Sequence, residues 1–311
     1  MSTHEPTTVQ VNVFLAALPP ARQVFGLPLL IVTETGNSLG GQVVRPFNSP
    51  QDVSTALAAT EISARTADFL NTAFAQQPRV SSILVKTAAA TAYDTAYTAA
   101  RAANDSFYGV AIDTVLAADV LDVSAAVETD GEKLFVGTSS DVDWLTSGVP
   151  AAFSALAGRE RTGIVYHNVA DEPVSLAWLA ARLGVADPDF RSAPWTGRAR
   201  DILANSPQLT AAQRDFALAN QANVGLPFGT APYYVKDGEN VSGRPLYEIL
   251  SADWYRARVR EDLVAAKLAS DDRGEKILVG IVGQTNSDGQ VIVETILRGR
   301  AEQGETAGHF A

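Results

Sequence analysis

The chain has 311 residues, and its 24 Lys and Arg against 35 Asp and Glu give a formal net charge of −11. At roughly 100–200 residues per domain, this length suits one large domain or two ordinary ones. Hydrophobic residues make up 46% of the chain, which is enough for a sizeable core. The acidic balance disfavours nucleic acid as a partner, because binding phosphate requires a basic surface. No apolar run approaches the roughly 18 residues of a membrane span, so we expect no membrane insertion.

The composition also leaves little for catalysis. There is no cysteine, which excludes disulfides, thiolate nucleophiles and zinc–thiolate sites. The only histidines are His4, His167 and His309, two of them near the ends of the chain. We therefore expect no catalytic residues, no metal site and no cofactor.

The first predicted element is an isolated strand at residues 9–17, VQVNVFLAA, which alternates loosely and is rich in β-branched residues. Two prolines, Pro19 and Pro20, end it. An apolar strand with no neighbour along the chain is an aggregation hazard in a monomer, and it suits donation to another subunit. Residues 1–26 are therefore predicted to form an N-terminal arm, with its strand presenting Val9, Val11, Val13, Phe14 and Leu15.

Strands and helices then alternate from residue 27 to residue 185. A helix start at Ser49-Pro50 follows the first strand, and apolar strands separated by helices of 10–15 residues are typical of βαβ units with a mainly parallel sheet. The predicted strands are residues 27–33, 80–86, 107–113, 133–138 and 162–167, and the predicted helices include residues 64–75, 92–103, 116–127 and 149–157.

Residues 186–311 are predicted to form a helix-rich part that completes the same core. It contains a helix at 209–222, a β-hairpin that turns near Asp237-Gly238, a long helix at 244–269 and a last helix at 289–303. The fold class is therefore α/β (α+β), with a mainly parallel sheet in the N-terminal two-thirds and helices with a hairpin in the C-terminal part.

A nucleotide-binding enzyme is the alternative that an alternating α/β pattern suggests. The turn after the first buried strand has Gly36, Gly40 and Gly41, which is the wrong spacing for a dinucleotide fingerprint, and no Walker A lysine loop exists. His167 ends a strand, where α/β sites often lie, but a structural role is the simpler interpretation. This alternative requires a pocket with convergent polar groups near His167 or the glycine loop.

A short basic cluster stands out within the long helix. Arg256 and Arg260 are one turn apart and share a face, whereas Arg258 lies across from them. Glu261 and Asp262 follow at once, so the arginines either pair internally or face an acidic protein partner.

The order of several segments is informative in itself. FGLPLLIV leads to a helix ending DFLNTAFAQQPRVSSILV, and then come DSFYGVAID and EKLFVGTSSD. LSADWYRARVREDL follows near the end, and a last helix runs into GHF. This series resembles the tail sheath proteins of contractile phages (myophages) and related injection particles, over residues 25–170 and 210–311. Phe107-Tyr108-Gly109 and Asp253-Trp254 stand where that family has the same residues. The chain is similar to a short sheath with few insertions.

The resemblance implies a structural role rather than an enzymatic one. Sheath subunits assemble as stacked hexameric rings around a tail tube, and contraction drives the tube through the host envelope for genome ejection. The implied partners are further copies of the chain, the tail tube protein, and baseplate and tail terminator proteins. The implied location is the phage tail of the virion, assembled in the cytoplasm of the bacterial host.

The resemblance also assigns roles to residues. It implies strand exchange between subunits through the N-terminal arm, and it places Arg256 and Arg260 against the tube. Family members continue past the GHF region into a C-terminal arm, so His309 and Phe310 would begin an arm that is short or truncated here. Another assembly protein, such as a tube, baseplate or surface-layer subunit, remains an alternative, as does the nucleotide-binding enzyme.

Overall fold

The computed structural model describes residues 24–34, 38–89, 91–184, 195, 197–228, 231–235, 238–272 and 287–307. The chain divides into two compact units, and the division falls after Leu250. The first unit is Val24–Leu250, and the described part of the second begins at Ser251. Each unit is described here by itself.

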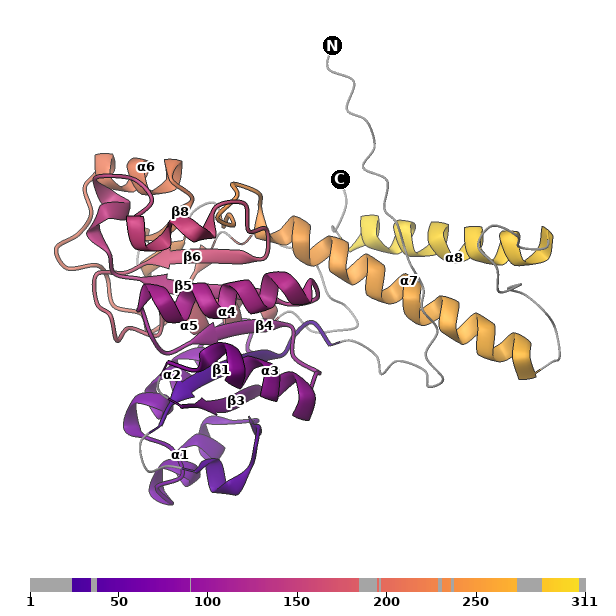
Figure 1. Ribbon diagram of the computed structural model, residues 1–311, viewed down its shortest axis with the longest axis horizontal. Coiled ribbons are helices and arrows are strands. Elements are labelled where there is room, and N and C mark those ends of the chain that lie inside the picture. Colours follow the sequence, from indigo (N-terminus) through magenta and orange to yellow (C-terminus); the bar gives the residue numbers. More distant parts are fainter. Residues whose placement is uncertain are drawn as a thin grey trace, which may run out of the picture. The chain divides into compact units, whose positions relative to one another are not determined.

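A nine-stranded sheet forms the centre of the first unit, in the order β2-β3-β1-β4-β5-β6-β8-β9-β7 (Figure 1). The pairs from β3 through β8 are parallel, whereas β2, β9 and β7 pair antiparallel with their neighbours. The expected mainly parallel sheet is therefore confirmed. The strands are β1 (Pro28–Thr33), β2 (Arg45–Phe47), β3 (Ile83–Ala88), β4 (Gly109–Ile112), β5 (Leu134–Ser139), β6 (Thr162–Tyr166), β7 (Gly197–Arg198), β8 (Ala222–Phe228) and β9 (Ala231–Val235).

Helices connect the strands, and local signals in the sequence set their ends. Ser49 caps α1 with Pro50 at its first position, and a capping box of Thr210 and Gln213 starts α6. Gly131 ends α4 with a φ of 70°, a conformation that favours glycine. The α-helices are α1 (Pro50–Ala58), α2 (Ala64–Phe74), α3 (Tyr93–Ala103), α4 (Ala117–Asp130), α5 (Val174–Leu183) and α6 (Ala211–Ala219), and the 3₁₀ helices are η1 (Leu39–Gly41), η2 (Val142–Leu145) and η3 (Ala151–Leu156).

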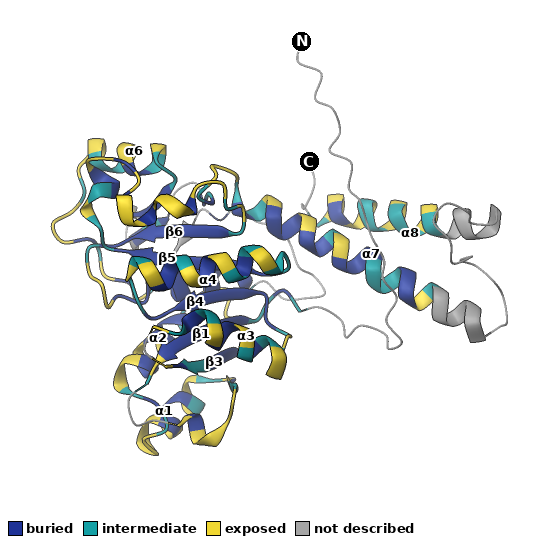
Figure 2. Ribbon diagram, viewed as in Figure 1, coloured by how far each residue is buried: buried dark blue, intermediate teal, exposed yellow. Residues whose placement is uncertain are grey.

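The helices cover both faces of the sheet, so that its central strands are buried (Figure 2). Buried residues of α3, α4 and α6 form one core cluster with β1, β3, β4, β5, β6 and β8. The other face packs against α5, which also contacts α2. Gly109 of β4 lets the strand approach α5 closely, because a Cβ there would lie 2.6 Å from Leu183 and 2.7 Å from Leu179.

The predicted elements of the first unit are found close to their expected positions, with one clear error. The hairpin exists, but β8 and β9 pair as Phe228 with Ala231, so the chain turns between these residues and not near Asp237-Gly238. Gly238 does have a left-handed φ of 71°, and a Cβ there would lie only 2.4 Å from the Cβ of Trp195. Glycine is therefore needed at position 238 because Trp195 packs directly against it, and not because the hairpin turns there.

The second unit contains the described parts of two long helices, α7 (Leu246–Asp272), which begins in the first unit, and α8 (Ser287–Thr306). Both helices were expected, and α8 returns beside α7 (Figure 1). Tyr255 donates a 3.3 Å hydrogen bond from its hydroxyl to the carbonyl of Leu297. Arg300 holds Asp262 by two bonds of 2.6 and 2.7 Å. These contacts fix the pairing of the two helices.

Candidate functional site

The arginine cluster of α7 separates into two kinds of residue. Arg258 is buried, and its Nη1 donates bonds of 2.9 and 2.8 Å to the two carboxylate oxygens of Glu261. Arg256 is exposed and Arg260 is half-buried, and neither forms an ion pair with a residue that the structure describes. Internal pairing therefore accounts for Arg258, and Arg256 is the arginine of this cluster that is open to a partner.

The remaining expected site residues belong to the two arms. Val9, Val11, Val13, Phe14 and Leu15, together with His309 and Phe310, lie outside the described residues. Their proposed roles in contacts between subunits therefore stay predictions.

His167 is fully buried and has partners on both sides of its ring. Its Nδ1 accepts a 3.1 Å hydrogen bond from the backbone N–H of Val169, so its Nε2 carries the proton and donates to the carbonyl of Leu203 at 2.9 Å. The ring packs against Tyr233, with centroids 5.4 Å apart. His167 thus fastens the loop after β6 to the segment around Leu203, which is a structural role.

The glycine loop after β1 does not offer a phosphate site in its described part. Gly36 lies outside the described residues, while Gly40 and Gly41 have left-handed φ values of 64° and 78°. A Cβ on Gly40 would lie 2.9 Å from Oε1 of Glu61. Glu61 forms an ion pair with Arg45, whose guanidinium also lies beside Gly40, so the cation at this loop is already engaged and the described part of the loop does not support the nucleotide-binding alternative.

A hollow lies at the carboxyl ends of β1 and β4, where the strand order reverses. The chain passes from β1 to β3 on one side and from β4 to β5 on the other, and such switch points are the usual ligand sites of open parallel sheets. We call this cavity, of about 310 Å³, the switch-point hollow. The residues that define it are Thr33, Arg65, Tyr93, Asp113, Leu116 and Asp171.

Asp113 is the buried centre of the switch-point hollow. It accepts a 2.6 Å hydrogen bond from the Tyr93 hydroxyl and a 3.2 Å bond from the backbone N–H of Thr33. Arg65 lies 3.6 Å from the same carboxylate and also pairs with Asp171 at 3.0 Å. Burial nevertheless raises the pKa of Asp113. Burial and the hydrogen bond to Asp113 together raise the pKa of Tyr93.

The charges of the switch-point hollow do not suit an anionic ligand. Asp113, Asp119 and Asp171 line it, against the single guanidinium of Arg65, which already pairs with Asp113 and Asp171. Phosphate recognition needs cationic groups or free backbone N–H groups pointing at the ligand. The charges of the switch-point hollow therefore do not support nucleotide binding there.

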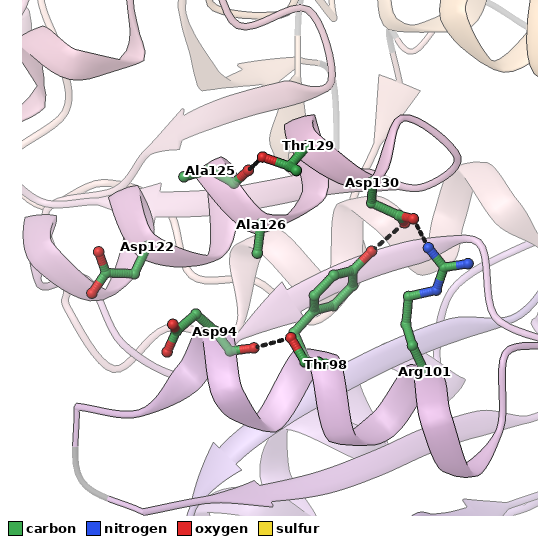
Figure 3. Close-up of a pocket in the computed structure, with 9 residues that line it drawn as sticks. Asp94, Thr98, Arg101, Asp122, Ala125, Ala126, Thr129 and Asp130 are labelled. Carbon is green, nitrogen blue, oxygen red and sulfur yellow. Dashed lines mark hydrogen bonds and ion pairs between the residues drawn. The ribbon is translucent and has the colours of Figure 1, made fainter.

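A second, larger concavity of about 530 Å³ lies between α3 and α4 (Figure 3). Ala125 and Ala126 form part of its wall, and Asp94 and Asp122 stand at its rim. Figure 3 shows Arg101 pointing toward Asp130 at the other end, where the two side chains form an ion pair. Its lining contains no histidine or lysine, and the hydroxyls of Thr98 and Thr129 donate to the carbonyls of Asp94 and Ala125 within their own helices.

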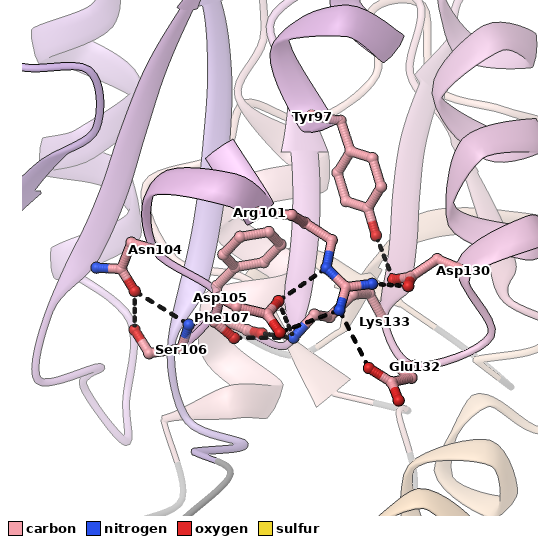
Figure 4. Close-up of polar contacts among 9 residues, drawn as sticks. All are labelled: Tyr97, Arg101, Asn104, Asp105, Ser106, Phe107, Asp130, Glu132 and Lys133. Carbon is pink, nitrogen blue, oxygen red and sulfur yellow. Dashed lines mark hydrogen bonds and ion pairs between the residues drawn. The ribbon is translucent and has the colours of Figure 1, made fainter. Parts of the chain in front are cut away.

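Arg101 also belongs to the amino-edge ion cluster, which consists of Arg101, Asp105, Asp130, Glu132 and Lys133 (Figure 4). Lys133 is buried, lies 2.9 Å from Oδ1 of Asp105, and donates to the carbonyls of Asp105 at 3.0 Å and Phe107 at 2.8 Å. Arg101 donates to Asp105 at 2.8 and 3.0 Å and to Glu132 at 3.1 Å.

The environment shifts the pKa values of this cluster in opposite directions. Burial lowers the pKa of Lys133. Burial alone would raise the pKa of Asp105, but hydrogen bonds from Arg101 and Lys133 outweigh it and hold that pKa below its usual value. The cluster thus ties the amino ends of β4 and β5 to the ends of α3 and α4, which is a structural function.

The sequence contained a signal for this cluster. Asp105 opens DSFYGVAID and Lys133 stands second in EKLFVGTSSD, two of the segments on which the family resemblance rests. Sequence reasoning missed the pair because 28 residues separate the two, and only the parallel pairing of β4 with β5 brings them together. Asp113 was likewise read only as the end of a strand, although an acidic residue directly after a buried strand is a recognisable signal.

In the part of the chain that the structure describes, no helix is long and apolar enough to cross a membrane. Among the same residues, no group of three His, Cys, Asp or Glu side chains is arranged to hold a metal ion.

Comparison with known proteins gives a fold likeness. No protein-family model matches the chain, and no curated protein matches it. Among solved structures, the chain is similar to a subunit of the anti-feeding prophage helical sheath in its contracted state, determined by cryo-EM. The TM-score is 0.58 and the sequence identity 14%, and the match covers 98% of this chain and 84% of the other. The protein therefore has a sheath-like fold.

Proposed function

We propose that the protein is a structural subunit of a contractile sheath, and that it acts by assembly and not by catalysis. The observation that supports this best is the fold likeness to a helical sheath over 98% of the chain. The order of sequence segments that resembles the tail sheath family supports it independently, because it rests on residues and not on backbone shape.

The finer features of the proposal come from the family resemblance. We infer that the subunits polymerise as stacked hexameric rings around a tail tube, between baseplate and terminator proteins, in a phage tail or a related injection particle made in the bacterial cytoplasm. Contraction drives the tube through the host envelope. The strand at residues 9–17 joins subunits through the N-terminal arm, and Arg256 and Arg260 face the tube. The exposure of Arg256 is consistent with that role.

General physics connects such an assembly with its work. Contacts between unlike surfaces of identical subunits generate open helical filaments rather than closed dimers. Energy is stored when the extended state is held by a kinetic barrier, and it is released when rigid subunits rotate into better contacts. A compact three-layer unit, with helices on both faces of its sheet, is suited to rotate as a rigid body.

The alternative function, an α/β enzyme that binds a nucleotide, has weaker support. Three carboxylates line the switch-point hollow around the guanidinium of Arg65, and the Arg45 guanidinium beside Gly40 is paired with Glu61, so at both candidate phosphate positions the nearby cation is already engaged. His167 has both ring nitrogens occupied by backbone partners.

The test is the assembly state of the purified full-length protein. We expect negative-stain electron microscopy to show rings or striated tubes, and sedimentation velocity to show species far larger than the 32.9 kDa chain. A parallel calorimetric titration with ATP and NAD addresses the alternative. A stable monomer at high concentration that binds either nucleotide would contradict the proposal.

A further inference from the structure

Half of the eight large apolar side chains that are exposed in the described residues lie at one edge of the sheet. Leu116 is 61% exposed, Val142 61%, Val169 38% and Leu203 64%. Single exposed apolar residues are ordinary, whereas several gathered at one place mark an interaction surface. We call these four residues the carboxyl-edge patch.

Topology brings the four residues together. Leu116 follows β4, Val142 follows β5 and Val169 follows β6, and these three parallel strands are neighbours about 4.8 Å apart, so their carboxyl ends meet at one edge. Leu203 is brought to the same edge by His167, which donates to its carbonyl at 2.9 Å, and by Glu172, which accepts from its N–H at 2.7 Å.

The carboxyl-edge patch has a recess and firm support. Leu116 forms part of the wall of the switch-point hollow, together with Ala170 and Asp171 from the loop that carries Val169. Val142 opens the 3₁₀ helix η2, whose first turn is capped by a 3.0 Å hydrogen bond from the N–H of Asp143 to Asp141. A surface held in place before binding loses less conformational entropy when a partner docks.

The charges around the patch indicate what kind of surface docks there. Asp141 and Asp143 flank Val142, and Asp171 next to the switch-point hollow is 80% exposed. The neighbouring cation, Arg65, is already paired with Asp113 and Asp171. Two copies of this patch facing each other would bring carboxylates together across the contact, and like charges at an interface disfavour association. The docking surface must therefore differ from the patch itself.

We propose that the carboxyl-edge patch binds a second copy of the chain, and that this copy presents a different surface. The inference rests on the proposed function, because a helical sheath is built from such unlike contacts between identical subunits. It goes beyond that function in naming the residues that receive the neighbouring subunit.

The test compares two double variants of the full-length chain. L116D/L203D places carboxylates in the patch, and V43D/L57D makes the same chemical change at residues that are 55% and 39% exposed elsewhere in the unit. Since all four side chains are exposed, both variants should fold, which circular dichroism and thermal melting verify. We expect L116D/L203D to lose at least tenfold in sedimentable polymer and V43D/L57D to match the wild type.

A mixing experiment tests whether the contacting surfaces are unlike. With unlike surfaces, L116D/L203D still binds through its other surface to the patch of a wild-type end, and then stops growth there. Added at one part in ten, it should shorten wild-type polymers severalfold in electron micrographs, whereas V43D/L57D should not. Polymers of unchanged length would overturn the unlike contact.

The remaining outcomes separate this inference from the proposed function. If the wild type polymerises and L116D/L203D polymerises equally well, the patch inference is wrong and the sheath proposal stands. If both double variants fail to polymerise, the effect is not specific to the patch, and the inference is also rejected. If the wild type itself remains a monomer, the proposed function fails, and the inference that rests on it falls too.

Discussion

Tyr97 donates a 2.6 Å hydrogen bond from its hydroxyl to Asp130, the carboxylate that also pairs with Arg101. Burial raises the pKa of Tyr97 to about 12, although the nearby Arg101 lowers it. Because the folded-state pKa lies above the unfolded value, the stability from this hydroxyl is fully present below pH 10 and is lost as the pH rises toward 12. We expect the wild type to lose about 1 kcal/mol more than Y97F between pH 9 and pH 11. Urea unfolding at the two pH values measures this difference, and equal losses would contradict it.

Removing the buried ammonium of the amino-edge ion cluster should destabilise the first unit. K133A leaves the carbonyls of Asp105 and Phe107 without the Lys133 ammonium as donor and removes one of the two cations that pair with the Asp105 carboxylate, the other being Arg101. We expect a loss of about 2–4 kcal/mol in the free energy of unfolding. Denaturant unfolding is the measurement, and K86A is the control, since Lys86 is half-buried and forms no ion pair with a described residue. Equal losses in the free energy of unfolding for K133A and K86A would show that the ion cluster does not stabilise the first unit.

Asp113 gives a prediction at acid pH. Burial raises its pKa in the folded state, so its contribution to stability is fully present below the unfolded-state pKa and falls as the pH rises through the folded-state value. D113N abolishes this titration, and its stability relative to the wild type should therefore increase between pH 4 and pH 7. Urea unfolding across this pH range measures whether the stability of D113N relative to the wild type rises or falls. D68N, a change at an exposed position of α2, controls for the loss of one negative charge.

Deleting residues 1–18 should abolish tube-like assembly while the first unit stays folded, because the predicted strand at 9–17 would no longer reach a neighbour. Sedimentation and circular dichroism report the two effects separately. A deletion of residues 1–7 alone, which spares the strand, should leave assembly intact. Polymers that form equally well without residues 1–18 would refute strand exchange through this arm.

Reversing two charges on α7 tests the proposed contact with the tube. R256E/R260E should weaken binding to isolated tail tubes at least tenfold, because a basic face then becomes acidic. R214E/R298E makes the same charge change on α6 and α8 and should leave binding unchanged. Co-sedimentation with tubes is the measurement. Unaltered binding of R256E/R260E would mean that these arginines face elsewhere.

Periodicity predicted most of the scaffold, because each buried strand is a short apolar run and most helices have one polar face. α5 was not predicted, since VSLAWLAARL is buried almost along its whole length and lacks such a face. β2 and β7 have three and two residues and leave no pattern to read. The hairpin turn was misplaced because Asp237-Gly238 has the composition of a turn, whereas the left-handed glycine is used against Trp195.

The candidate sites were harder to predict than the fold. The ion pair of Lys133 with Asp105 joins two strands, and the exposure of Leu116 and Leu203 depends on where loops from distant positions end. Neither follows from local spacing, because both depend on strand order. Arg258 illustrates the same limit: helical spacing separated it from Arg256 and Arg260 and allowed internal pairing, but its burial beside Glu261 does not follow from that spacing.

The two outer strands of the sheet have a consequence for how the protein meets other polypeptides. β2 is three residues long and contains Pro46, which has no N–H to offer, and β7 has only two residues. β2 and β7 offer too few backbone N–H and C=O groups for a strand of another molecule to pair with them. Short edge strands of this kind also disfavour amyloid-like aggregation at high concentration. Association through β2 and β7 must therefore depend on side chains, and the proposed arm strand at residues 9–17 would have to pair with backbone other than these two strands.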